Sequence, residues 1–354
     1  EGLGIGASRA WKMAKEKGIP RLFFINRIDR EMADFNKTLA QIQDIYGQTV
    51  CVPVTIPVGK EAGFSKVANV LSDKDVPAEI AKDLNLAKER LMDAVAESDE
   101  ELMARYLDGE ELSEAQISVG LQKSIMAGSL APVLAGSVTK DIGVEELMNA
   151  IVNLVPPPLA AGAKKFENGS ELKLSADGQG FAYVFKTVSD PFIGHLAFFR
   201  VLSGAFKSDS EIHNVTKREK ERFGSIMIMN GKSNSQIQSA LPGTIFAVAK
   251  LKSTSIGDTV STAPSDNVIP KTVYPNPVMC YSITAAKGGE EEKISLALAK
   301  IAENDKTIRI ERHPETRELL LYSMGDQHMS QIVKKLKNQN KLEMVLAAPK
   351  VPYR

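Results

Sequence analysis

The 354-residue chain is short of cysteine, aromatic residues and long apolar runs. Two cysteines, Cys51 and Cys280, are too few for a disulfide framework, and their strand-like apolar surroundings predict two buried, reduced thiols. No apolar run approaches the length of a membrane span, and no charged-then-apolar leader opens the chain. We therefore expect a cytoplasmic, monomeric protein with no membrane partner. The four histidines lack the spacing of metal ligands, so the sequence predicts no metal site.

The net charge of zero hides a division between the two parts of the chain. Residues 1–157 carry 17 Lys and Arg against 24 Asp and Glu, a net charge of −7, whereas residues 158–354 carry 27 against 20, a net charge of +7. A basic part beside an acidic one is typical of a protein that faces RNA with one part and basic protein surface with the other. Chance scatter of solvated charge is the alternative interpretation.

The apolar run from Leu22 to Ile25 is the first feature that points to a binding site. A run without alternation predicts a strand buried on both faces of a parallel sheet, and ligands bind beyond the carboxyl ends of such strands. There the sequence has Asn26, Arg27, Ile28 and Asp29, of the form N-[K/R]-x-D. The Asp29 carboxylate suits the N1 and N2 donors of guanine, the stem of Arg27 is expected over the base, and Asn26 is expected to reach a phosphate loop. A ligand-free turn is the alternative for this tetrad alone.

A second apolar run, Ala131 to Ala135, ends in Gly136, Ser137 and Val138. Two neighbouring strands with such ends place both loops over one base, with the Val138 backbone N–H toward guanine O6. We therefore predict a guanine-binding site formed by both loops.

With these two loops in place, the chain resembles the translational GTPases of the elongation factor G type. The resembling stretches are Ile19 to Phe35, Val54 to Gly59, Tyr106 to Ile117, Pro132 to Met148, Ser189 to Gly204 and Leu251 to Ser261. Their order and spacing run along nearly the whole chain. The resemblance implies GTP and GDP as ligands, Mg²⁺ as cofactor, the ribosome as partner, and GTP hydrolysis coupled to ribosomal translocation.

The expected fold is multidomain, α/β plus β. Residues 1–157 resemble the C-terminal part of a P-loop-type GTPase domain, with an α-rich subdomain inserted at 58–130. A linker at 158–169 leads to an antiparallel β-barrel at 170–265, and a second linker at 266–276 leads to a ferredoxin-like βαββαβ domain at 277–348. Residues 349–354 resemble the start of a further domain.

Local patterns support these elements. Ser8 to Lys17 is predicted to be a helix with Ser8 as its N-cap, and Ser113 with Gln116 predicts a capping box. Residues 50–56 alternate as one strand does.

Two charged segments are candidate ribosome contacts. The segment from Glu97 to Glu114 contains eight acidic residues and one basic residue, Arg105. It lies in the insertion that, in the family, faces the ribosomal stalk protein. A solvated helix pair is the alternative there. In the barrel, a hairpin arm suited to rRNA phosphates carries four cations, diluted by two glutamates, and a solvated turn is the alternative. These cations are Lys217, Arg218, Lys220 and Arg222.

The sequence has no G-x-x-x-x-G-K-[S/T] phosphate loop. Gly2, Gly4 and Gly6 imitate one, but no Lys-Ser/Thr follows them, and the D-x-x-G match at Asp177 to Gly180 is predicted to be a turn. The chain is therefore expected to start within the GTPase domain, to contain no catalytic residue, and to be inactive alone; the full-length protein is expected to hydrolyse GTP.

Two departures from the family pattern are present, and the first resembles a divergent branch of elongation-factor-G-like paralogues. Residues 325–329 read Gly-Asp-Gln-His-Met instead of Gly-Glu-Leu-His-Leu, and Asp305 precedes Lys306 instead of proline. His328 is expected to be structural, because no partner acid is near it in sequence. A ribosomal protection factor, a release-factor-type GTPase, and a ribosome-binding paralogue without GTPase activity remain alternatives.

Overall fold

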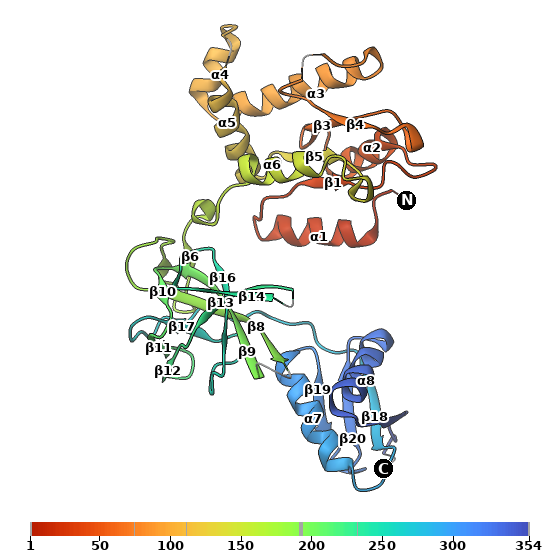
Figure 1. The fold of residues 1–354 in the computed structure, drawn as a ribbon, viewed down its shortest axis with the longest axis vertical. Coiled ribbons are helices and arrows are strands. Elements are labelled where there is room, and N and C mark those ends of the chain that lie inside the picture. Colours follow the sequence, from red (N-terminus) through yellow and green to blue (C-terminus); the bar gives the residue numbers. More distant parts are fainter. Residues whose placement is uncertain (1, 74, 111, 191–193, 232, 353–354) are drawn as a thin grey trace. The chain divides into compact units, whose positions relative to one another are not determined.

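The computed structural model describes residues 2–73, 75–110, 112–190, 194–231 and 233–352 (Figure 1). The chain divides into two compact units, residues 1–161 and residues 162–354. Within the described ranges, no helix combines the length and the apolarity that a membrane crossing requires.

A parallel three-stranded sheet lies at the centre of the first unit, in the order β1-β5-β2. Its strands are β1 (Phe23–Ile25), β5 (Ala131–Ala135) and β2 (Cys51–Pro53). The central strand β5 is fully buried, whereas β1 is half-buried. The prediction that the first strand is buried on both faces was therefore wrong, because β1 lies at an edge of this sheet and has β5 as its one described neighbour.

Helices cover both faces of this sheet. On one face, Ala131 and Val133 pack with Trp11 of α1 (Ile5–Glu16) and Ile42 of α2 (Phe35–Tyr46). On the other, Leu134 packs with Ala150 of α6 (Val144–Leu154). Helix α1 begins after Gly4, so the expected N-cap at Ser8 was wrong.

The segment between β2 and β5 forms an α-rich subdomain around a hairpin. The segment 50–56, predicted to be one strand, forms two, which belong to different sheets and meet at Val54. The Val54 N–H donates to the Val133 carbonyl in the parallel sheet, whereas the Val54 carbonyl accepts the Val70 N–H beside the hairpin. Strand β3 (Thr55–Val58) pairs with β4 (Lys66–Asn69), and the 3-10 turn η1 (Glu61–Gly63) lies between them. Helices α3 (Ala78–Ala96), α4 (Glu100–Leu107) and α5 (Glu114–Ala127) follow. The capping box at Ser113 and Gln116 is confirmed.

The second unit contains an antiparallel sheet of eight strands in the order β12-β11-β17-β8-β9-β16-β13-β14. Its core is aromatic, with Phe199, Phe206, Phe223 and Phe246 almost fully buried. The strands are β8 (Phe181–Asp190), β9 (Gly194–Ser203), β11 (Glu211–Asn214), β12 (Glu219–Arg222), β13 (Ile226–Asn230), β14 (Ser233–Ile237), β16 (Ile245–Ala249) and β17 (Thr259–Ser261). Two short strand pairs complete this part of the second unit: β6 (Lys164–Lys165) with β7 (Glu171–Leu172), and β10 (Phe206–Lys207) with β15 (Ser239–Ala240). The 3-10 turn η3 (Pro158–Ala161) ends the first unit.

The C-terminal αβ domain has its elements in the order βαββαβ that the sequence pattern predicts. They are β18 (Met279–Ala285), α7 (Glu291–Asn304), β19 (Arg309–Arg312), β20 (Leu319–Ser323), α8 (Asp326–Asn340) and β21 (Met344–Ala347). The sheet order is β19-β20-β18-β21, and Leu298 of α7 and Leu336 of α8 pack with Leu321 in the core.

The two cysteines are free thiols in different environments. Cys51 is fully buried, as expected, whereas Cys280 is only partly buried. The expectation for Cys280 was wrong because it lies on the face of the C-terminal sheet opposite to Ile283, away from the helices.

Candidate functional site

The two predicted loops lie side by side at one edge of the parallel sheet. Strands β1 and β5 are neighbours with Ile25 opposite Ala135, so the residues that follow each strand come together. The Gly136 N–H donates to the Ile25 carbonyl at 3.0 Å, and the Ile28 N–H donates to the Gly136 carbonyl at 3.4 Å. The structure thus brings together the loop 26–29 and the loop 136–138.

Asn26 ties these two loops to each other. Its Oδ1 accepts the Arg27 N–H at 2.8 Å and the Val138 N–H at 3.0 Å. Asn26 thus contacts Val138, whose N–H was expected to face guanine O6, while the link from Asn26 to a phosphate loop stays a prediction. Asn26 reaches Val138 because β1 and β5 are paired and end side by side, which brings the carboxamide oxygen of Asn26 next to the Val138 N–H.

Asp29 carries the clearest sign of a ligand. The carboxylate is half-buried, and its Oδ1 atom is buried without a hydrogen-bond partner among the described residues. A hydrogen bond from Ser137 lowers the pKa of the Asp29 carboxyl below its usual value, with help from the charges of Lys140 and Arg30, so the group is ionised at neutral pH. A buried carboxylate oxygen without a donor is unfavourable, and a ligand with N–H donors would satisfy it.

Two glycines give the second loop its shape. At Gly136 a Cβ atom would lie 2.5 Å from Cζ of Phe24, and at Gly143, whose φ is +79°, it would lie 2.3 Å from the Ala135 carbonyl oxygen. Between them, Ser137 and Ile142 exchange two backbone hydrogen bonds of 2.8 and 3.1 Å around the 3-10 turn η2 (Val138–Lys140). The loop is therefore a closed turn that only glycine permits at both ends.

Sequence reasoning missed two residues of this site. Thr55, almost fully buried, accepts the Ala135 N–H with its Oγ1 at 2.9 Å and so fixes the end of β5. Gly143 closes the second loop, and its position directly before an amphipathic helix was the available signal. Nothing in the sequence marked Thr55, because 80 residues separate it from Ala135.

Arg27 has a left-handed backbone with φ of 63°, which is uncommon for a residue other than glycine. Its exposed guanidinium has no partner among the described residues. The side chain is thus available to a ligand at the same edge of the sheet.

The four cations of the predicted basic arm differ in availability. Lys217 forms an ion pair with Asp258 at 3.3 Å and donates to Ser255 Oγ at 2.8 Å, and Lys220 pairs with Glu211 at 2.9 Å. Arg218 is 84% exposed and 3.9 Å from the equally exposed Asp266. In the described structure, exposed Arg222 has no side-chain partner. Arg222 is therefore the cation of the arm without a side-chain partner in the described structure, whereas Arg218 has a long, exposed ion pair with Asp266.

His328 has the partner acid that its sequence neighbourhood lacked. Its Nδ1 accepts the Met324 N–H at 3.2 Å, so Nε2 carries the hydrogen and faces Asp305 Oδ2 at 3.2 Å. Burial raises the pKa of Asp305, but hydrogen bonds from Thr307 and the nearby His328 outweigh it, so the net shift is downward. The pair joins the end of α7 to the start of α8.

No group of three or more His, Cys, Asp or Glu side chains that suits a metal ion is found in the described part of the chain. The sequence also has no phosphate-loop Ser or Thr that would bind Mg²⁺ beside nucleotide phosphates, so the residues present do not fit the Mg²⁺ that the resemblance implies.

Comparisons with known proteins cover most of the chain. The elongation factor Tu GTP binding domain matches residues 1–157, elongation factor G domain 2 matches residues 180–263, and elongation factor G domain III matches residues 274–348. The chain is also similar to a crystal structure of a protein from Thermus thermophilus, with a TM-score of 0.87 and 25% identity. That match covers 100% of this chain and 53% of the solved one, so this chain spans about half of that protein's length. The chain belongs to the translational GTPases of the elongation factor G type.

Proposed function

We propose that the chain recognises guanine within a ribosome-associated GTPase that couples GTP binding and hydrolysis to ribosomal translocation. The observation that carries this proposal is the buried Oδ1 of Asp29, beside Ser137, which has no hydrogen-bond partner among the residues that the structure describes. We also propose that the eight-stranded sheet is the barrel of the family's second domain and that the C-terminal αβ domain is ferredoxin-like, with the domain limits predicted above.

In this proposal each loop residue has a defined task. Asp29 accepts the N1 and N2 donors of guanine, which adenine cannot supply in the same arrangement. Arg27 covers the base, and Asn26 holds the loops together. Gly136 and Ser137 shape the second loop, and the Val138 N–H is shared with guanine O6.

GTP hydrolysis by this chain alone is not expected. The sequence has no phosphate loop, and the described residues offer no metal site, so binding rests on the base and is weak. We propose that hydrolysis requires residues of the phosphate loop and switches that the family has elsewhere.

The ribosome is the proposed partner at two surfaces. Arg222, which has no side-chain partner in the described structure, and Arg218, whose 3.9 Å ion pair with Asp266 is exposed, would contact rRNA phosphates. The acidic segment around α4 is proposed to contact the ribosomal stalk protein, although Asp99 is engaged by Lys123 and Glu101 by Arg105. Exposed Glu100 and Glu110 stay available.

A ribosome-binding paralogue without GTPase activity is the second candidate function. The altered residues 325–329 favour it. It predicts ribosome binding that is insensitive to guanine nucleotides, whereas the first proposal predicts a nucleotide-dependent interaction.

The base-recognition assignment is tested with nucleosides, because they avoid the missing phosphate contacts. Saturation-transfer NMR would compare guanosine and xanthosine binding to the chain, to Asp29→Asn, and to Asp44→Asn as a matched control on the exposed face of α2. We expect Asp29→Asn to weaken guanosine binding about tenfold and to favour xanthosine, whose C2 carbonyl accepts from the new amide. Unchanged base preference in Asp29→Asn would refute the assignment.

A further inference from the structure

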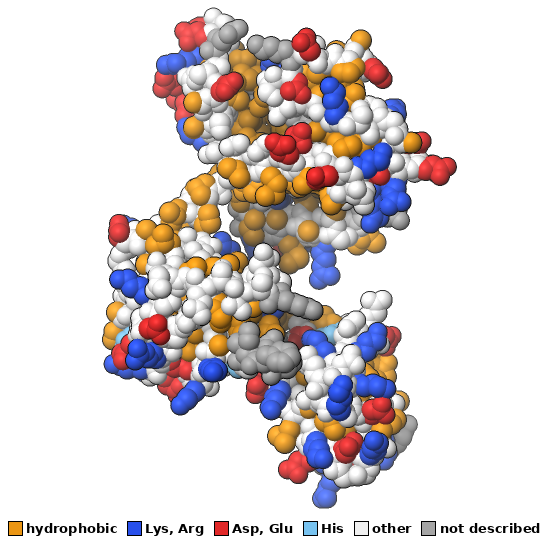
Figure 2. Space-filling view, in the orientation of Figure 1, with side chains coloured by type: hydrophobic (Ala, Val, Ile, Leu, Met, Phe, Trp, Pro, Cys, Tyr) orange, Lys and Arg blue, Asp and Glu red, His pale blue; other side chains and the backbone are white. Residues whose placement is uncertain are grey.

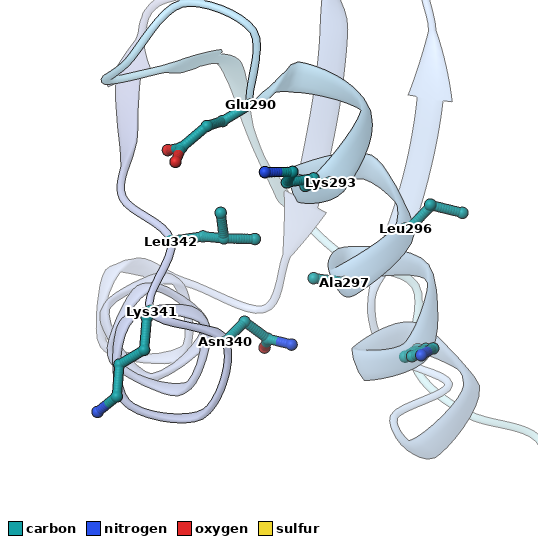
Figure 3. Close-up of a pocket in the computed structure, with 8 residues that line it drawn as sticks. Glu290, Lys293, Leu296, Ala297, Asn340, Lys341 and Leu342 are labelled. Atoms are coloured by element: carbon teal, nitrogen blue, oxygen red, sulfur yellow. The ribbon is translucent and has the colours of Figure 1, made fainter.

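The C-terminal αβ domain has an open groove of about 420 Å³ between α7 and the turn after α8 (Figure 3). Helix α7 contributes Lys293, Leu296, Ala297 and Lys300, which lie along one side of the helix at i, i+3, i+4 and i+7. Leu342, which follows α8, points toward Ala297 across the groove. None of these residues belongs to the guanine site.

The charge of the groove is positive. The ammonium groups of Lys293 and Lys300 have no ion-pair partner among the described residues, and Lys341 adds a cation at the opposite edge. Glu290 is the acidic residue of the lining. In an adjoining hollow of about 280 Å³, the carboxylate of Glu343 is held by Lys337 at 2.8 Å and does not offset these charges. Figure 2 shows Lys and Arg prominent on the visible face of this domain.

The floor of the groove is apolar. Ala297 is 6% exposed and Leu342 is 8% exposed, while Leu296 at the rim is 61% exposed. The groove thus combines an apolar strip with a lysine one helical turn to either side of it. An anion alone does not use the apolar strip, whereas an amphipathic partner uses both features.

We propose that this groove binds an acidic amphipathic helix of a partner protein. Lys293 and Lys300 are roughly 10 Å apart along the axis of α7, so two acidic side chains two turns apart on a helix laid along α7 match them. Apolar residues one turn after the first acid then reach Leu296 and Ala297. Nucleic acid fits less well, because the exposed Leu296 stands between the two cations where a sugar-phosphate strand would pass. The inference requires neither nucleotide binding nor ribosome binding by the rest of the chain.

The test uses a fluorescein-labelled synthetic helix of about 18 residues, long enough for measurable helicity. It carries two glutamates two turns apart and two leucines between them, and binding to the full chain is read by fluorescence anisotropy. The Lys293→Glu/Lys300→Glu variant is compared with Lys334→Glu/Lys335→Glu, which makes the same charge change on exposed positions of α8 outside the groove. Leu296→Ser is compared with Val345→Ser, another half-exposed apolar residue of this domain.

We expect the groove pair to weaken peptide binding about tenfold or more, and the α8 pair to change it less than about threefold. Leu296→Ser should weaken binding about threefold or more, and Val345→Ser should leave it unchanged. A peptide with lysine in place of both glutamates should not bind the original chain. Equal losses in the two lysine pairs, or no effect of Leu296→Ser, would overturn the proposal. So would binding of a labelled single-stranded RNA through Lys293 and Lys300 without binding of the peptide, which would assign the surface to nucleic acid.

Discussion

Gly143→Ala should destabilise the first unit strongly. Gly143 has φ of +79°, and a Cβ atom would lie 2.3 Å from the Ala135 carbonyl oxygen and 3.0 Å from Cα of Gly136. A left-handed alanine costs about 1–2 kcal/mol, and forced displacement of packed backbone adds about 1–3 kcal/mol. We therefore expect a loss of about 2–5 kcal/mol in the free energy of unfolding of this unit.

Gly18→Ala is the matched control. Gly18 has φ of +61°, yet nothing lies within 4 Å of the position of its Cβ atom. This variant should therefore show the backbone cost alone, about 1–2 kcal/mol. The difference between the two variants isolates the clash with the end of β5.

The assay uses the only tryptophan of the chain. Trp11 stacks on Tyr46 with ring centroids 4.3 Å apart and on Phe23 at 5.3 Å, so its fluorescence reports on the first unit alone. Urea denaturation followed at Trp11 gives the stability of that unit without the signal of the second. Because the clash shifts the loop that holds Ser137, guanosine binding should fall in Gly143→Ala and persist in Gly18→Ala. Equal stability of the two variants would show that the close approach to Ala135 does not constrain the loop.

Three further outcomes are expected. Asn26→Ala removes the acceptor of the Val138 N–H, so hydrogen exchange at Val138 should accelerate about two- to tenfold relative to the buried Val133 amide; an unchanged ratio would mean that the two loops are held by other contacts. Burial raises the pKa of Glu221, but hydrogen bonds from Thr254, Ser253 and Lys252 lower it overall, so its contribution to stability is present above its unfolded pKa and lost as the pH falls through the folded value. Circular-dichroism melting should therefore show the original chain more stable than Glu221→Gln at pH 7, with the difference shrinking below about pH 4; a difference independent of pH would contradict this. Burial raises the pKa of Cys51 to about 12, so in a Cys280→Ser variant no thiol should react with Ellman's reagent at pH 8 until denaturant is added, and rapid reaction of the folded variant would show that Cys51 is accessible.

Much of the organisation of this protein is encoded locally. The apolar runs before Asn26 and Gly136 predicted two neighbouring strands, and their pairing follows because parallel strands with similar ends share one edge of a sheet. The capping box at Ser113 and the βαββαβ order of residues 279–347 were also predictable, because each depends on residues close together in sequence.

Contacts between distant residues were decided by tertiary structure alone. The position of β1 at a sheet edge depends on which strands pair with it, and its sequence does not contain that information. Asp305 reaches His328, and Asp258 reaches Lys217, across stretches of chain whose path no local pattern describes. Such distant partners decide whether a charged side chain is available to a ligand. The sequence by itself therefore determined which elements form and which residues end them. The fold decided which of those residues remain free to bind a ligand.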